Sequence, residues 1–176
     1  VYRLDGDGNE SDDFTILIPA YNEEQTIQNA INALKEIRPD VERAGFNLLI
    51  YVVDDGSTDN TNQLARQGGA DRVIKHKVNT GLGAAVRSGL FAARRDRADI
   101  AVKFDADLQH DPNDIIGLIN PILTDEADIV YGNRFGQIEY KMPLVRRAGN
   151  TVFTKLMSML TKWPLKDSQC LCCLRL

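Results

Sequence analysis

The stretch Leu48-Leu49-Ile50-Tyr51-Val52-Val53-Asp54-Asp55-Gly56-Ser57 contains the longest uninterrupted apolar run of the chain and ends in two carboxylates. A brief apolar run bounded by Asp and Gly is typical of a β-strand. Gly56 permits a sharp turn after the strand, and Ser57 or Thr58 can cap the helix that follows. The stretch therefore predicts a strand over residues 48–54 that leads directly into a helix.

The same order of strand and helix recurs along the chain. Further strands are predicted at residues 14–19, 72–76, 100–104 and 129–131. Helical spacing of apolar residues occurs at residues 26–38, 58–67, 82–94 and 113–123. Strands that alternate with helices imply right-handed crossovers and a mostly parallel sheet with helices on both faces. We therefore predict a Rossmann-like α/β fold.

Composition favours one globular domain in the cytoplasm. The chain has 176 residues and a formal net charge of −4, and it contains no block of Lys and Arg, which argues against a nucleic-acid partner. The longest apolar run is far shorter than the ~20 residues of a membrane-spanning helix. No charged-then-apolar signal segment precedes the first predicted strand. We therefore expect a cytoplasmic protein, and a membrane anchor beyond its end stays open.

The two ends of the chain differ from the domain between them. Residues 1–13 are acidic and lack apolar periodicity, which predicts a flexible leader. The cysteines of the chain lie together near its end: Cys170, Cys172 and Cys173. A zinc site there would need a fourth ligand, and His76 and His110 lie in unrelated segments. We therefore predict one domain over residues 14–169 and, at residues 170–176, an atypical tail that is truncated or frame-shifted.

A second pair of acids follows the predicted strand at residues 100–104, in Lys103-Phe104-Asp105-Ala106-Asp107-Leu108-Gln109-His110. Residues two apart in an extended chain point the same way, so Asp105, Asp107 and Gln109 can face one pocket. Hard oxygen ligands at this spacing suit Mg²⁺ or Mn²⁺ carrying a substrate diphosphate. The alternative is that both acids are turn and helix-cap residues ahead of Asp111-Pro112. We favour the metal site because other polar clusters accompany the pair.

These clusters are expected to share one edge of the sheet. Open parallel sheets bind ligands outside the carboxyl ends of their strands. Polar residues follow three predicted strands there, at residues 19–23, 54–57 and 105–107. One of Asp54 and Asp55 is predicted to accept hydrogen bonds from a base or ribose, and the alternative is that both only end the strand.

Three later segments can also contribute. Residues 79–86 form a glycine-containing loop before a helix, and we expect this loop to pack near the nucleotide. Arg134 and the pair Arg146-Arg147 can clamp phosphate in a bidentate fork, or they can be solvated surface residues. Residues 144–160 have helical spacing, and both a lipid interface and packing against the sheet stay open for them.

Four motifs carry a resemblance to a known family: Ile18-Pro19-Ala20-Tyr21-Asn22-Glu23-Glu24, Val53-Asp54-Asp55-Gly56-Ser57, Asn79-Thr80-Gly81-Leu82-Gly83 and Asp105-Ala106-Asp107-Leu108-Gln109-His110. From Phe14 to about Gln169 the chain resembles the family 2 glycosyltransferases with the GT-A fold. The similarity is to the branch of dolichol-phosphate mannosyltransferase and related polyprenyl-phosphate glycosyltransferases. Asp167-Ser168-Gln169 matches the start of a segment that usually continues Thr-Gly-Phe-Arg, and this continuation is absent here.

The resemblance implies roles for individual residues. The donor contacts it implies are Pro19, Ala20, Tyr21, Glu23, Asp54, Asp55, Gly83, Asp105 and Ala106. The metal and diphosphate ligands are Asp105, Asp107 and Gln109, with Mg²⁺ or Mn²⁺ as cofactor. The catalytic residues are Asp107, Arg134 and Asp167, and Arg134 and Arg147 meet phosphate groups.

The resemblance also implies a reaction. An inverting enzyme would move a sugar from a nucleotide sugar, GDP-mannose or a UDP-hexose, to a polyprenyl (dolichyl) phosphate, with peripheral membrane contact at the cytosolic face. A phosphate acceptor has a second pKa near ~6, arrives ionised and needs no strong base. A sugar hydroxyl needs a base, for which Asp167 is the candidate. The alternatives are a sugar-hydroxyl acceptor in cell-surface glycan synthesis, a nucleotidyltransferase, and an inactive nucleotide-binding fragment.

Overall fold

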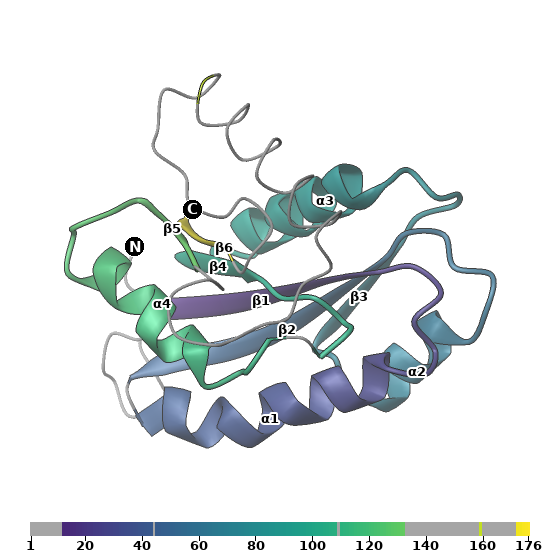
Figure 1. Ribbon diagram of the computed structural model, residues 1–176, viewed down its shortest axis with the longest axis horizontal. Coiled ribbons are helices and arrows are strands. Elements are labelled where there is room, and N and C mark those ends of the chain that lie inside the picture. Colours follow the sequence, from purple (N-terminus) through teal and green to yellow (C-terminus); the bar gives the residue numbers. More distant parts are fainter. Residues whose placement is uncertain (1–11, 44, 109, 133–158, 160–171) are drawn as a thin grey trace, which may run out of the picture.

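The computed structural model describes residues 12–43, 45–108, 110–132, 159 and 172–176 of the chain (Figure 1). Five residues of the expected site lie outside these ranges: Gln109, Arg134, Arg146, Arg147 and Asp167. Apart from Met159, the expected helix over residues 144–160 lies outside them too.

Six strands form one sheet in the order β3-β2-β1-β4-β6-β5. They are β1 (Asp12–Ala20), β2 (Phe46–Asp54), β3 (Arg72–Lys75), β4 (Ile100–Lys103), β5 (Ile129–Tyr131) and β6 (Cys172–Arg175). β1 pairs in parallel with β2 and β4, and β2 pairs in parallel with β3. β6 pairs antiparallel with both of its neighbours, β4 and β5. The mostly parallel sheet predicted from the sequence is confirmed.

Helices cover both faces of this sheet, as predicted. They are α1 (Ile27–Arg43), α2 (Thr61–Gln67), α3 (Leu82–Arg95) and α4 (Asp114–Leu123). Figure 1 shows α1, α2 and α4 on one face and α3 on the other. Among the described residues, no helix is both long and apolar enough to cross a membrane.

Two helix boundaries differ from the sequence prediction. α1 continues past residue 38 to Arg43, although Pro39 removes a helical hydrogen bond, because Val41 is buried in the core. α2 begins only at Thr61, and neither Ser57 nor Thr58 caps it. Ser57 Oγ and the Thr58 backbone N–H bond to Asn22 of the neighbouring loop instead.

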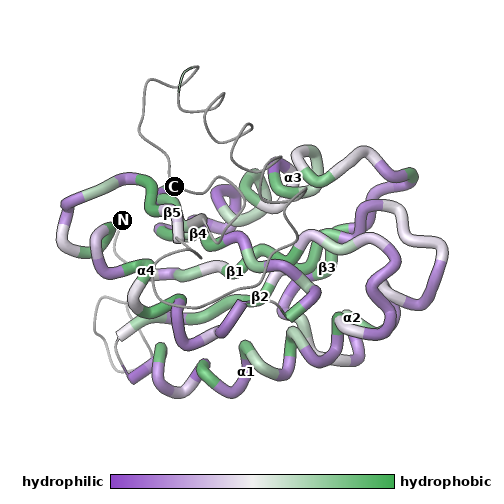
Figure 2. Tube along the Cα trace, in the orientation of Figure 1, coloured by the Kyte–Doolittle hydropathy of each residue, from purple (hydrophilic) through white to green (hydrophobic). Residues whose placement is uncertain are grey.

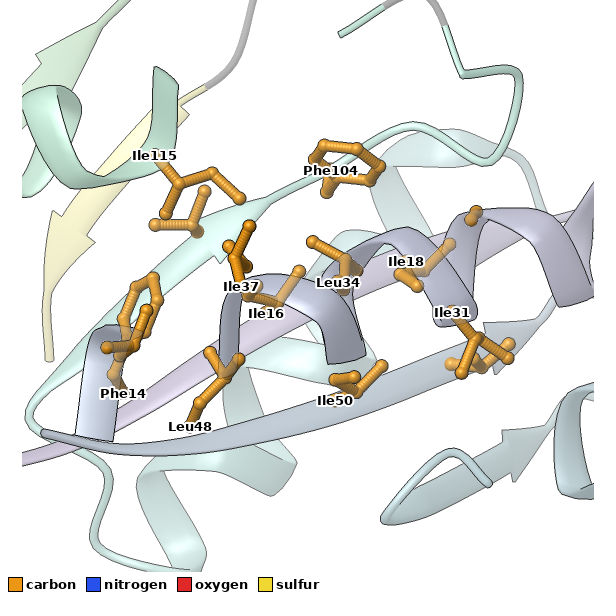
Figure 3. Close-up of a cluster of buried hydrophobic side chains, with 14 of the residues drawn as sticks. Phe14, Ile16, Ile18, Ile31, Leu34, Ile37, Leu48, Ile50, Phe104 and Ile115 are labelled. Atoms are coloured by element: carbon orange, nitrogen blue, oxygen red, sulfur yellow. The ribbon is translucent and has the colours of Figure 1, made fainter. Parts of the chain in front are cut away.

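The core lies on both faces of β1. Phe14, Ile16 and Ile18 point toward α1, α2 and α4 (Figure 3), whereas Leu17 points toward α3. Each such side chain contributes about 1.5–3 kcal/mol when it is fully buried. In Figure 2 the central strands are mainly green and α1 alternates between green and purple, as expected for a helix with one buried face.

Small residues bring α3 close to the sheet. The buried positions of α3 are Ala85, Gly89 and Ala93. A Cβ added at Gly89 would lie 3.2 Å from Leu17 Cδ2 and 3.3 Å from Val53 Cγ2. This close approach fixes where the first residues of α3 stand relative to the strand ends.

The last strand was not expected. The sequence analysis set residues 170–176 apart from the domain, but Cys172–Arg175 forms β6 between β4 and β5, and Cys173 is fully buried there. Because β6 pairs with strands far away in the sequence, the local alternation of strands and helices does not reveal it.

Candidate functional site

The candidate site lies where the order of the strands reverses. From β1 the chain moves outward through β2 to β3 and then returns to the other side of β1 as β4. The carboxyl ends of β1 and β4 therefore flank the topological switch point, where open α/β sheets bind ligands. Tyr21 follows β1 there and is exposed, while Asp105 and Asp107 follow β4.

Backbone hydrogen bonds join the loops after β1 and β2. The N–H of Asp55 donates to the carbonyl of Ala20 at 2.8 Å. The N–H of Asn22 donates to Ser57 Oγ at 3.0 Å, and the N–H of Glu23 donates to Thr61 Oγ1 at 2.8 Å. The structure thus brings the predicted donor residues after β1 against those after β2.

Asp54 is fully buried at the end of β2. Its carboxylate accepts hydrogen bonds from the N–H of Ser57 at 2.8 Å and from Asn62 Nδ2 at 3.0 Å. Lys75 Nζ lies 3.9 Å away. The side chain therefore holds the turn after β2 and the start of α2. Its contact with a nucleotide-sugar donor stays a prediction.

Asp55 holds the loop before α3. Its carboxylate accepts hydrogen bonds from the hydroxyl and N–H of Thr80 and from the N–H of Gly81, at 2.7 to 3.1 Å, and lies 2.6 Å from His76 Nδ1. Burial would raise the pKa of Asp55, but the hydrogen bonds from Thr80, His76 and Gly81 outweigh it and lower the pKa to about 2. Asp55 is thus a buried carboxylate that stays charged.

The acidic pair after β4 is asymmetric. Asp105 Oδ2 lies 2.6 Å from Lys103 Nζ and 3.3 Å from His110 Nε2. Burial would raise the pKa of Asp105, but the hydrogen bond from His110 and the charge of Lys103 lower it below its usual range. Asp107 is exposed, and Ala106 between the two acids is buried.

These oxygen donors fit a cation that arrives with a diphosphate. In the part of the chain that the structure describes, no group of three or more His, Cys, Asp or Glu side chains gathers as metal ligands. Mg²⁺ and similar ions are usually held by one or two carboxylates together with substrate phosphates and water, so a complete protein cage is not required. The Asp105–Asp107 pair at the switch point provides such carboxylates.

A hollow of about 880 Å³ opens beside the loop before α3. Its lining includes Thr80 and Gly83, and among the described residues that line it the charged groups are Lys75, Lys77 and Arg87, without an acidic side chain. A Cβ at Gly83 would meet no described atom within 4 Å. An anionic group can therefore approach the backbone of this loop.

Sequence reasoning missed several residues of the site. His76 and His110 were considered only as zinc ligands, and Ser88 and Lys103 were given no role. Lys103 stands two residues before Asp105 and could have been found from strand periodicity. The contacts of His76 with Asp55 and Ser88 join three elements, so no local pattern reveals them.

Comparison with known proteins decides the family. The family model described as Glycosyl transferase family 2 matches residues 15–175. The chain belongs to glycosyl transferase family 2. This confirms the resemblance seen in the four motifs and favours a glycosyltransferase over the nucleotidyltransferase alternative.

Relatives that are similar over most of the chain include two that are named for dolichyl phosphate. UDP-N-acetylglucosamine--dolichyl-phosphate N-acetylglucosaminyltransferase of Methanococcus voltae is 38% identical over 172 residues, covering 88% of this chain and 65% of the relative. Dolichyl-phosphate hexose transferase of Haloferax volcanii is 32% identical over 157 residues, covering 89% of this chain and 63% of the relative. The chain thus spans somewhat less than two thirds of these relatives.

A solved structure of similar fold is glucosyl-3-phosphoglycerate synthase from Mycobacterium tuberculosis, in complex with Mn²⁺, UDP and phosphoglyceric acid. Its TM-score is 0.67 at 26% identity, and the match covers 93% of this family 2 chain and 56% of the synthase. The predicted GT-A fold is confirmed.

Proposed function

We propose that this family 2 protein transfers a sugar from a nucleotide sugar to a polyprenyl (dolichyl) phosphate, with inversion at the anomeric carbon. The observation that carries the proposal is the similarity, over 88% of the chain, to a relative named for transfer to dolichyl phosphate. The clustering of the four motifs at one edge of the sheet supports it. The donor sugar and base are left to experiment, with UDP-N-acetylglucosamine, UDP-glucose and GDP-mannose as candidates.

The donor is proposed to lie across the carboxyl ends of β1, β2 and β4. Its nucleoside would contact residues 19–23 and the edge formed by Asp54, Asp55 and Gly83. The joined loops after β1 and β2 support this placement, because they present a preorganised surface. The cationic hollow beside Gly83 adds electrostatic attraction for a phosphorylated ligand.

The diphosphate of the donor is proposed to lie at the acidic pair. Mg²⁺ or Mn²⁺ held by Asp107, with Asp105 and Gln109 beside it, would offset the charge that develops on the departing diphosphate, a contribution of several kcal/mol. Lys103 and His110 keep Asp105 ionised and hold its carboxylate in one orientation. Asp107, exposed at the strand end, is therefore the carboxylate that we assign to the cation.

The acceptor is proposed to attack from the side opposite the diphosphate. A phosphate oxygen that is already ionised attacks the anomeric carbon without giving up a proton, so no general base is needed. We assign Arg134 and Arg147 to the phosphate groups. A hydroxyl acceptor would instead require Asp167 as base, and the phosphoglyceric acid in the related synthase structure keeps a hydroxyl-bearing acceptor as the second candidate. Transfer to a lipid acceptor would place the reaction at the cytosolic face of a membrane.

One assay tests the proposal. The full-length protein is incubated with Mn²⁺, each of the three radiolabelled nucleotide sugars, and either dolichyl phosphate in detergent or a soluble glycan acceptor. We expect label in the lipid fraction with one donor, and loss of transfer on addition of EDTA. Label found only on the soluble acceptor would reject the lipid-phosphate proposal in favour of the hydroxyl acceptor.

A further inference from the structure

Asp55, which is buried, and His76, which is half-buried, form a hydrogen-bonded pair that links three elements. His76 directly follows β3, and its N–H donates to the carbonyl of Asp54 at 2.9 Å. Its Nδ1 lies 2.6 Å from Asp55 Oδ1, after β2, and its Nε2 lies 2.9 Å from Ser88 Oγ, within α3. Both ring nitrogens are therefore engaged.

The hydrogen bonds of this network assign its protons. Asp55 stays ionised, so it can only accept hydrogen bonds. We therefore place a proton on Nδ1, where it is donated to Asp55. Nε2 lies 2.9 Å from Ser88 Oγ and forms the second hydrogen bond of the ring. The Asp55 carboxylate also accepts from Thr80 and Gly81, so each donor around it has an acceptor.

The network fixes the loop that leads to Gly83. The carbonyl of Gly81 accepts the N–H groups of Ala84 and Ala85, so the first turn of α3 starts from the residues that Asp55 holds. The backbone of the turn after β2 lies directly against this loop, because a Cβ at Gly56 would fall 2.4 Å from the carbonyl carbon of Val78. A shift of the Asp55 carboxylate would therefore move the loop at the donor edge.

We propose that His76 is a positioning residue for the nucleotide-sugar donor. Through Asp55 it holds the turn at Thr80 and Gly81, and thereby presents the backbone around Gly83 to the donor. Ser88 sets the orientation of the ring from the opposite side. This inference rests on the proposed function, since it concerns the donor of that reaction.

A positioning role and a purely structural role of His76 predict different results. A purely structural role lowers the melting temperature when His76 is replaced, and leaves donor affinity of the folded protein unchanged. A positioning role raises the KM for the donor and the Kd for its nucleotide, with a smaller change in kcat. Measuring donor affinity well below the melting temperature of each variant distinguishes the two roles.

The test uses His76→Ala, His76→Asn, Ser88→Ala and Thr80→Val in the full-length protein, with Arg94→Ala, at an exposed residue in the last turn of α3 that does not line the hollow, as the control. The probes are UDP and GDP with Mn²⁺ in calorimetry, and the corresponding nucleotide sugar in the transfer assay. We expect the Kd of the nucleotide and the KM of the donor to rise about tenfold in His76→Ala, as for a lost hydrogen bond to a charged group. Asn can still reach Asp55, so His76→Asn should recover part of the affinity.

The remaining variants test the direction of the effect. Thr80→Val should weaken binding while the His76 ring is kept. Ser88→Ala should have a smaller effect than His76→Ala, and Arg94→Ala should match the wild type. If His76→Ala and Thr80→Val both bind the donor with wild-type affinity, the positioning role of His76 is overturned, and the proposed function is not. Absence of nucleotide binding and of transfer in the wild type would overturn the proposed function, and this inference with it.

Discussion

Lys103 Nζ lies 2.6 Å from Asp105 Oδ2, so the first carboxylate of the acidic pair is matched by a cation from the strand that precedes it. Both side chains are largely shielded from water, with 16% and 28% of their surfaces exposed. Asp105 is therefore held by Lys103 and His110, and Asp107 is exposed.

Replacing Lys103 by Met should raise the pKa of Asp105 toward its usual range, because the ammonium that favours the carboxylate is lost. A lowered pKa in the folded state contributes stability above the unfolded pKa, and this contribution is lost as pH falls through the folded pKa. The melting temperature of Lys103→Met should therefore fall below that of the wild type at pH 7, and the gap should narrow toward pH 3. Scanning calorimetry from pH 7 to 3 measures this. Lys77→Met, at an exposed lysine, should show no such pH-dependent gap.

Asp107→Asn should abolish metal-dependent transfer while leaving the fold intact. Asn keeps the size of the side chain but removes the charge that we assign to the cation, so we expect a loss of about 100-fold or more in kcat/KM. The melting temperature should change little, because Asp107 is exposed. Asp114→Asn, at an exposed acid in the first turn of α4, is the matched control and should retain activity. Mn²⁺-dependent transfer at the wild-type rate in Asp107→Asn would contradict the assignment.

Asp55→Asn should destabilise the protein at neutral pH. The pKa of Asp55 falls from a usual 3.8 to about 2 in the folded state, which corresponds to about 2 kcal/mol of stability above pH 4. This stability is lost between about pH 4 and pH 2, so the difference between the variant and the wild type should shrink over that window. Urea unfolding at a series of pH values tests the sign. A difference that grows on acidification would contradict the role of Asp55 as a charged acceptor.

Gly56→Ala should destabilise the fold more than Gly45→Ala. Both glycines have positive φ, +75° and +92°, so both variants strain the backbone by roughly 1–2 kcal/mol. At Gly56 the added Cβ would also meet backbone atoms, at 2.4 and 2.6 Å from Val78 and Asn79, whereas a Cβ at Gly45 would meet no described atom within 4 Å. We expect a loss of more than about 3 kcal/mol in the free energy of unfolding for Gly56→Ala. Equal losses in both variants would show that strain alone acts at Gly56.

The sequence predicted the strands and helices that frame the site because their signals are local. Apolar periodicity and turn residues located β1 to β5 and α1 to α4, with boundary differences where distant contacts intervene. The turn after β2 shows where prediction from local signals fails. Ser57 and Thr58 look like caps for the next helix, but Asn22 offers them hydrogen bonds from another loop. A cap prediction considers only neighbours in sequence, and here a tertiary contact is made in its place.

For the candidate site, too, the local features were predicted and the tertiary contacts were not. The residues after β1, β2 and β4 were expected at one edge because parallel strands end together, and the structure places them there. The partners of Asp55 and Asp105 could not be assigned in advance, except that Lys103 obeys strand periodicity. Asp54 and Asp55 look alike in the sequence, yet one holds the turn after β2 and the other holds the loop before α3.

From its sequence alone, this chain is determined to be an α/β protein with acidic clusters at the carboxyl edge of its strands, because periodicity and turn chemistry are properties of neighbouring residues. Only the tertiary structure decided that Cys172–Arg175 enters the sheet and that His76 links Asp55 to Ser88. Those contacts join segments distant in the chain. Their formation depends on the packing of whole elements against one another, which no local pattern encodes.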